Sequence, residues 1–198
     1  MSNKKRILLD VDGVLADFTS GVLNVINAHF DTAHKPEHVT RFDIAASLGL
    51  SPEQASWFKR EIGSHAQFAR KLEPYPGAVE GYARLAAVAD VFIVTSPWNS
   101  NPTWTHDREW WLKKHFAIPH SRVVHTSAKF LCAGDHLVDD KTEACVAWTD
   151  AHDCVIGEGH ASARRTGYAL RWSTLHNRLD EYDGETVHSW DELIARVA

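Results

Sequence analysis

Two aspartates, Asp10 and Asp12, close a short apolar stretch near the beginning of the chain. Side chains at positions i and i+2 of an extended strand lie on one side, so both carboxylates are expected at the end of a strand over Arg6–Val11. Gly13 lets the backbone turn sharply after them. Two adjacent carboxylates repel each other unless a cation neutralises them or one is protonated, and such oxygen ligands suit Mg²⁺ beside a substrate phosphate. The alternative is a solvated turn after the strand.

Polar clusters also follow three further apolar runs, at residues 90–94, 122–125 and 136–138. Thr95 and Ser96 offer hydroxyls and backbone amides to phosphate oxygens, and Lys129 offers a positive charge. Asp139 and Asp140 add two more carboxylates. Taken singly, these are equally typical of turns, helix caps or solvated surface charges. Their order and their shared position after strands favour a functional site.

The predicted strands alternate with predicted helices. Alanine, leucine and other good helix formers indicate helices over residues 79–88, 105–116 and 142–148. Alternation of this kind is typical of an α/β protein with a parallel sheet flanked by helices, in which ligands bind at the carboxyl ends of the strands. Every polar cluster described above lies at such an end.

Residues 17–76 break this alternation, because they contain helical pieces over 19–30 and 52–62 but no convincing strand. We expect a small helical cap, residues 17–76, inserted after the first strand into a core formed by residues 1–16 and 77–198. Two prolines and a glycine in residues 73–77 make the stiff turn that returns the chain to the sheet.

The tail is less regular than the rest of the chain. It offers candidate strands at Cys154–Ile156 and Tyr168–Leu170, with a loop over Glu158–Thr166 between them. A closing helix is predicted over Ser189–Val197, with Ser189 as its cap and Glu192 at its third position.

Composition narrows the class of protein. The chain has 198 residues, of which 44% are hydrophobic and 24% charged, and a net charge of −5. This excludes disorder, and it argues against a nucleic-acid polymer as partner, which would require a basic excess. The apolar run Ile7–Leu9 is too short for a signal-peptide core or a membrane span. Three cysteines without a CxxC spacing fit a reducing compartment, so we expect a cytoplasmic protein.

The motifs in this order resemble those of the haloacid dehalogenase (HAD) superfamily. The matching segments are Asp10–Phe18, Val94–Pro97, Lys129 and the pair Asp139 and Asp140. Within the superfamily, the closest resemblance is to the 5'(3')-deoxyribonucleotidases, which the stretch Leu72–Glu80 and the spacing from Lys129 to the Asp pair also resemble. The resemblance implies a Rossmann-like HAD core with a parallel sheet, and it does not extend to the cap or the tail.

The resemblance also implies roles for the carboxylates. Asp10 would attack phosphorus and form an aspartyl-phosphate, and Asp12 would protonate the leaving oxygen and later activate water. Mg²⁺ would be bound by the Asp10 carboxylate, the Asp12 backbone carbonyl and Asp140. Asp139 would orient this set or serve as the alternative ligand.

Phosphate binding would fall to Thr95, Ser96 and Lys129, with Lys129 also offsetting the charge of the nucleophile. Dehalogenases lack the second aspartate of the first motif, so Asp12 argues for a phosphate ester as substrate. Asp135 could belong to a metal motif with Asp139. We exclude it as a ligand, because it would lie at the far end of the strand, about 10 Å away at ~3.3 Å per residue.

Aromatic residues of the cap are candidates for a substrate pocket. In the resembling family an aromatic pocket holds the base, and Phe18 matches one such position. Further candidates are Phe42, Trp57, Phe58 and Phe68 from the cap, together with Trp98 and Arg108 after the second strand. The alternative for each aromatic is packing in the core of a small cap.

The sequence therefore predicts a Mg²⁺-dependent phosphomonoesterase that hydrolyses nucleoside monophosphates. One alternative is the same chemistry on another small phosphomonoester, such as a sugar phosphate. A second is a catalytically silent module that binds a nucleotide, although such a module would not need both Asp10 and Asp12. We expect a small-molecule partner and no membrane or nucleic-acid partner, and a homodimer is left open.

Overall fold

A computed structural model describes residues 4–152 and 167–198. Its centre is a six-stranded, wholly parallel sheet in the order β3-β2-β1-β4-β5-β6. The strands are β1 (Arg6–Leu9), β2 (Asp90–Thr95), β3 (Val123–His125), β4 (His136–Asp139), β5 (Tyr168–Trp172) and β6 (Glu185–Val187). The predicted α/β class with a parallel sheet is confirmed.

Helices cover both faces of the sheet, because successive strand residues point to opposite sides. On one face, Ile7 and Leu9 of β1 belong to a large core shared with helices α4, α5 and α7. On the other face, Leu8 packs in a smaller core with Cys145 and Trp148 of helix α6. These helices are α4 (Ala78–Val88), α5 (Trp104–Phe116), α6 (Thr142–His152) and α7 (Trp190–Val197).

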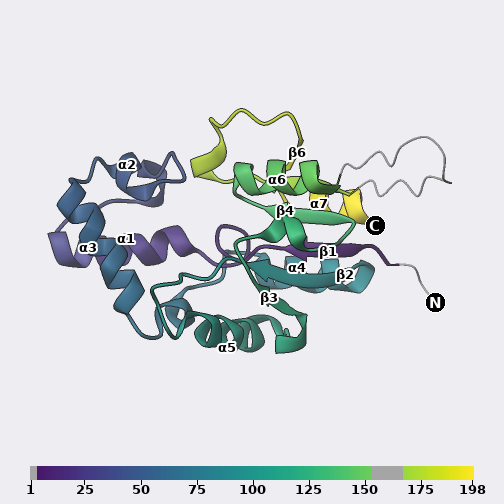
Figure 1. Ribbon diagram of the computed structural model, residues 1–198, viewed down its shortest axis with the longest axis horizontal. Helices are drawn as coiled ribbons and strands as arrows, with labels where there is room; N and C mark the ends of the chain where they lie inside the picture. Colours follow the sequence, from purple (N-terminus) through teal and green to yellow (C-terminus); the bar gives the residue numbers. More distant parts are fainter. Residues whose placement is uncertain (1–3, 153–166) are drawn as a thin grey trace.

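The segment between β1 and α4 is helical. It contains α1 (Phe18–Phe30), α2 (Ile44–Leu48) and α3 (Pro52–Ser64), with 3₁₀ turns η1 (Pro36–His38) and η2 (Phe68–Lys71). The side chains of Asp17, Asp43 and Ser51 accept hydrogen bonds from the first turns of α1, α2 and α3, which satisfies amides that a helix start leaves free. Figure 1 shows these three helices grouped at the end of the molecule opposite both chain termini.

The chain leaves the sheet and returns to it at neighbouring points. Ala16 pairs with Pro74 in an isolated bridge, and the Asp17 amide donates to the Glu73 carbonyl. Gly77, at φ +79°, is the N-cap residue that immediately precedes α4. The proposed division into a core and a cap at residues 16 and 77 remains a prediction, and these contacts are consistent with it.

Some elements differ from those predicted. Helix α2 and strand β6 were not anticipated, because each is too short to show a clear period in the sequence. The closing helix α7 is capped by Ser189, which accepts from the Glu192 amide. The candidate strand Cys154–Ile156 and the loop Glu158–Thr166 lie outside the described residues. None of the helices in the described ranges is long and apolar enough to cross a membrane.

Candidate active site

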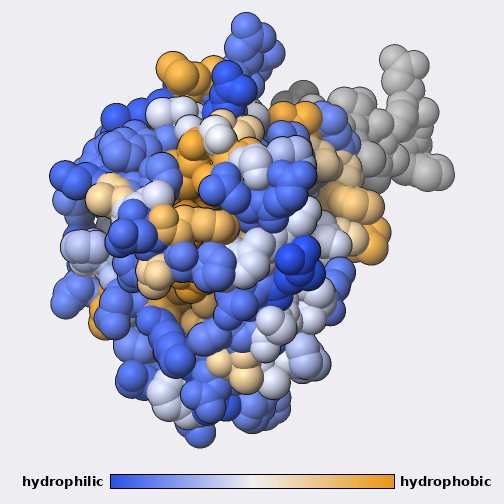
Figure 2. Space-filling view, turned by 90° about the vertical axis from the view of Figure 1, so that its left-hand side faces the viewer, coloured by the Kyte–Doolittle hydropathy of each residue, from blue (hydrophilic) through white to orange (hydrophobic). Residues whose placement is uncertain are grey.

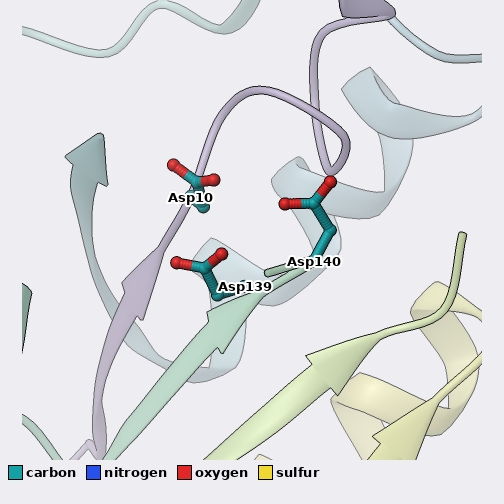
Figure 3. A group of neighbouring side chains, drawn as sticks. All are labelled: Asp10, Asp139 and Asp140. Carbon is teal, nitrogen blue, oxygen red and sulfur yellow. The ribbon is translucent and has the colours of Figure 1, made fainter. Parts of the chain in front are cut away.

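Two neighbouring strands bring the predicted acidic residues together. Asp10 follows β1 directly, and Asp139 and Asp140 lie at the end of β4, its hydrogen-bonded neighbour. Figure 3 shows the three carboxylates converging in the space beyond these two strand ends. Their nearest oxygens all lie within 4.8 Å of one another, and all three residues are buried.

Lys129 neutralises part of this acidic cluster. It lies on the 3₁₀ turn η4 (Lys129–Leu131), and its Nζ is 2.8 Å from Asp10 Oδ1 and 2.6 Å from Asp139 Oδ2. Burial on its own would lower the pKa of Lys129, but the two carboxylates raise it above its ordinary value. Lys129 therefore stays positively charged between Asp10 and Asp139.

The two aspartates at the end of β4 have different partners. Asp139 accepts hydrogen bonds at both oxygens, from Lys129 Nζ and from the Lys141 amide. Asp140 Oδ2 lies 2.9 Å from His176 Nε2. Burial is the main cause that raises the pKa of Asp139 and of Asp140, and the neighbouring Asp10 carboxylate raises both further. Hard oxygen donors at this spacing fit Mg²⁺.

Asp12 is held by a tight turn and by an arginine from α5. The Val11 carbonyl accepts from the Leu15 and Ala16 amides, at 2.8 Å each, which closes the turn. Arg108 Nη2 donates to Asp12 Oδ1 at 2.6 Å. Burial raises the pKa of Asp12 to about 6, although the Arg108 guanidinium pulls it down, so this carboxyl can carry a proton near neutral pH.

Gly13 is required by both conformation and space. Its φ is +82°, a region that side chains rarely adopt, and a Cβ there would lie 1.8 Å from Asp140 Oδ2. The turn after β1 can therefore approach Asp140 only because residue 13 has no side chain.

Thr95, the last residue of β2, supplies a free hydroxyl. Its Oγ1 is buried and has no hydrogen-bond partner among residues 4–152 and 167–198. Thr95 and Lys129 both line the cavity in front of Asp10. An unpaired buried hydroxyl is costly unless a ligand satisfies it. Ser96 Oγ is close to the Thr126 carbonyl, at 3.4 Å.

The cavity of about 620 Å³ lies between the strand ends and the helical segment. Of the predicted pocket residues, the structure brings Phe18, Phe42, Phe58 and Trp98 to its wall, together with Asp10, Asp12, Thr95, Ser96, Lys129, Asp139 and Asp140. Figure 2 views the end of the molecule that carries α1, α2 and α3, where apolar side chains lie recessed between polar ones. The site thus combines a charged floor with aromatic walls.

Three predicted pocket residues lie elsewhere. Trp57 stacks on His29, with ring centroids 3.7 Å apart. Phe68 is buried among the aromatic residues of the core, stacked on Trp104 at 6.1 Å. Arg108 is completely buried behind Asp12 rather than in the cavity wall. Which aromatic side chains face the cavity depends on how each helix is rotated about its own axis. The sequence pattern does not define that rotation closely enough to choose between neighbouring positions.

The structure also brings to the cavity residues that were not among the predicted pocket residues. Trp104 lines the cavity, and so does His176, from the 3₁₀ turn η5 (Leu175–Asn177). Asn177 Nδ2 donates to the Asp140 carbonyl at 2.7 Å, so this part of the tail holds Asp140 through both side chain and backbone. The only available signal was the predicted strand at Tyr168–Leu170, since a turn after a parallel strand lies at the same edge of the sheet.

Comparison with protein families and curated sequences gives consistent matches. The model of the family described as "5' nucleotidase, deoxy (Pyrimidine), cytosolic type C protein" matches residues 4–197. The mitochondrial 5'(3')-deoxyribonucleotidase of Mus musculus is 33% identical over 147 residues, covering 72% of this chain and 67% of the mouse protein. The cytosolic-type enzyme of Homo sapiens is 31% identical over 147 residues, covering 71% and 73%. The human mitochondrial protein is 32% identical, and the match covers 63% of its length.

Solved structures with the same fold are more distant in sequence. A haloacid dehalogenase-like hydrolase from Streptococcus pneumoniae superposes with a TM-score of 0.60 at 15% identity, covering 100% of both chains. A HAD hydrolase from Bacillus subtilis, solved with bound magnesium, gives 0.57 at 12% identity and covers 98% of both. The chain has the HAD fold, and the family model matches residues 4–197, which is almost the whole chain. This chain therefore belongs to the 5' nucleotidase, deoxy (pyrimidine), cytosolic type C family.

Proposed function

We propose that this protein is a Mg²⁺-dependent 5'-nucleotidase that hydrolyses nucleoside monophosphates through an aspartyl-phosphate on Asp10. Its family makes it a hydrolase of phosphoric monoesters. The observation that carries the detailed proposal is the floor of the cavity. There Asp10, the Lys129 ammonium and the unpaired Thr95 hydroxyl converge where one phosphate group would lie.

In the first step, an Asp10 carboxylate oxygen attacks phosphorus and the bond from phosphorus to the ester oxygen breaks. Asp12 donates its proton to that oxygen, so the nucleoside leaves as a neutral alcohol. A pKa of about 6 suits Asp12 to this exchange, because both protonation states are accessible near neutral pH. Lys129, Thr95 and Ser96 hold the phosphate oxygens as charge moves onto them.

In the second step, Asp12, now a carboxylate, takes a proton from water. The resulting hydroxide attacks the phosphorus of the aspartyl-phosphate, which releases inorganic phosphate and restores the Asp10 carboxylate. Asp12 regains its proton in the same step, so the cycle leaves both residues as they began.

A metal ion fits beside Asp10, and we assign Asp140 rather than Asp139 as its second side-chain ligand. Both Asp139 oxygens already accept hydrogen bonds, which suits Asp139 to orienting Lys129. The Asp12 backbone carbonyl completes the proposed protein ligands. Mg²⁺ at this position would offset the negative charges of the phosphate and of the nucleophile.

A nucleoside is favoured over a sugar as the leaving group because the cavity walls are aromatic. Phe18, Phe42, Phe58 and Trp98 offer ring faces, and stacking of a base on an aromatic ring contributes roughly 1–3 kcal/mol. Pockets for sugars use many more polar groups. The names of the similar proteins specify deoxyribonucleotides, and we extend that substrate class to this chain.

The test is phosphate release with Mg²⁺ from a panel of deoxyribo- and ribonucleoside 5'-monophosphates, 3'-monophosphates and sugar phosphates. We expect turnover of 5'-nucleotides, loss of that turnover in EDTA, and loss of at least about 10³-fold in Asp10→Asn, because the nucleophile is removed. Asp135→Asn is the matched control. Asp135 accepts from the Arg6 amide at the opposite end of the sheet, so this variant should keep its activity.

Other outcomes would redirect the assignment. Turnover of sugar phosphates alone would favour the same chemistry with another substrate, and nucleotide binding without any turnover would favour a silent binding module. Full activity in Asp10→Asn would contradict the nucleophile.

A further inference from the structure

We propose that Arg108 is a positioning residue for the phosphatase reaction: it anchors one oxygen of Asp12 so that the other faces the ester oxygen of the substrate. The inference rests on the proposed function, in which Asp12 is the proton donor. It assigns a purpose to an arginine that lies outside the cavity wall and touches no part of the space where a substrate would bind.

The two partners of the Arg108–Asp12 ion pair differ in their exposure. The Arg108 side chain is 0% exposed, whereas that of Asp12 is 26% exposed and lines the cavity. The guanidinium therefore lies behind the carboxylate, with Nη2 at 2.6 Å from Oδ1. That contact leaves Oδ2 as the oxygen free to carry a proton.

The arginine itself is fixed by its surroundings. Its guanidinium carbon lies 5.2 Å from the ring centroid of Trp104 and 5.6 Å from that of Trp111, two buried tryptophans on the same helix. Trp111 in turn donates from Nε1 to the Leu72 carbonyl at 2.6 Å. Packing of this kind locks rotamers, which is what a supporting residue needs in order to hold a reacting group.

Ordinary stabilisation does not explain the arrangement. Nε and Nη1 of Arg108 are buried without hydrogen-bond partners in the described part of the chain, so there the guanidinium is hydrogen-bonded through Nη2 alone, to Asp12. A buried arginine with unpaired donors lowers the free energy of unfolding, so a role other than stabilisation accounts better for its position. Among residues 4–152 and 167–198, its one hydrogen-bonding partner is Asp12, the proposed proton donor.

The test compares two leaving groups. A nucleoside 5'-monophosphate releases an alkoxide unless it is protonated, whereas p-nitrophenyl phosphate releases a phenolate that needs little help from an acid. We expect Arg108→Met to lower kcat/KM for the best nucleotide of the panel by about 10²-fold and that for p-nitrophenyl phosphate by less than about 5-fold. The value of kcat/KM reports only the steps up to and including departure of the leaving group, so the later hydrolysis of the aspartyl-phosphate does not affect it.

Two controls separate positioning from general damage. Arg70→Met breaks a different ion pair with α5, that of Arg70 with Asp107, and should leave the ratio of the two substrates unchanged. In an Asp12→Asn background, Arg108→Met should have less than about a 3-fold further effect on nucleotide turnover, because the residue it positions is already inactive.

If Arg108→Met does not fold, Arg108→Lys keeps the charge while losing the planar fork, and it should shift the ratio in the same direction. Equal losses for both substrates, or an undiminished effect in the Asp12→Asn background, would overturn the proposal. The Asp10→Asn protein tells this failure apart from failure of the proposed function, because loss of p-nitrophenyl phosphate turnover there tests the nucleophile without reference to Arg108.

Discussion

At the scale of single residues, the site depends on a few close approaches. Gly13 brings the turn after β1 within reach of Asp140, and Lys129 places one positive charge between two buried carboxylates. Each arrangement is intolerant of substitution for a different reason, space in the first case and charge in the second. Both can be tested against a matched position elsewhere in the chain.

Gly13→Ala should lower kcat/KM by at least about 10²-fold, because the new Cβ must displace the Asp140 carboxylate or the turn, and small displacements in a site cost about that much. Gly77→Ala is the control. Gly77 has a similar φ of +79° but nothing within 4 Å of its Cβ position, so it bears only a backbone cost of about 1–2 kcal/mol. Steady-state kinetics and thermal unfolding distinguish them. Equal activities in the two variants would show that space around Asp140 does not matter.

Lys129→Met should reduce the free energy of unfolding by about 3–5 kcal/mol in EDTA, because it leaves Asp10 and Asp139 buried without their cation. Lys114→Met makes the same change at an exposed lysine over Trp110 and should cost less than about 1 kcal/mol. Urea denaturation followed by circular dichroism measures both. A Lys129→Met protein as stable as the control would mean that the carboxylates do not depend on this ion pair.

At the scale of elements, one carboxylate joins η2 to the beginning of α5. Asp107 accepts from the Gln67 amide, from Arg70 Nε and from Thr103 Oγ1, and is itself buried. The connection lets the chain turn at Gln67, which has a φ of +67°. The clamp therefore fixes η2 against the first turn of α5.

Asp107→Ala should therefore lower the free energy of unfolding by about 2–3 kcal/mol, since it removes several hydrogen bonds to a buried charge. Asp90→Ala breaks the Asp90–Arg122 pair, in which both side chains are about one third exposed or more, and should cost less than about 1 kcal/mol. The comparison uses urea midpoints of the two variants. Similar losses would show that the clamp is no stronger than a surface pair.

At the scale of the whole molecule, the two ends of the sheet have different chemistry. The carboxyl ends of the strands carry the acidic site, whereas His136 begins β4 at the other end, buried, with Nδ1 3.2 Å from the Tyr168 carbonyl. Burial lowers the pKa of His136 below its ordinary value. Protonation of this histidine therefore opposes folding. The homodimer that the sequence left open stays a prediction.

The pKa of His136 gives a stability prediction with a definite sign. The unfolded chain binds a proton at about pH 6.5, where the folded protein does not, so stability should fall as the pH drops below that value. The contribution of one group is at most about 1.4 kcal/mol per pH unit. His136→Gln should flatten the decline of urea midpoints between pH 7 and pH 5.5. An unchanged slope would mean that His136 is not among the groups responsible.

The sequence by itself determined the alternation of strands and helices and the strand ends at which the motif residues lie. These follow from local periodicity and from the rule that the carboxyl ends of parallel strands meet at one edge of a sheet. For that reason Asp10, Lys129, Asp139 and Asp140 could be expected together, although they span about 130 positions along the chain.

Only the tertiary structure decided which side chains complete the site. Arg108 pairs with Asp12 across 96 positions, and His176 meets Asp140 from a tail in which the sequence showed no chemistry. Trp57 and Phe68 lie away from the cavity, whereas Trp104 lines it. Such choices depend on how far each helix rotates as it packs, and a rotation of one residue changes which side chain faces the site without changing the pattern of the sequence.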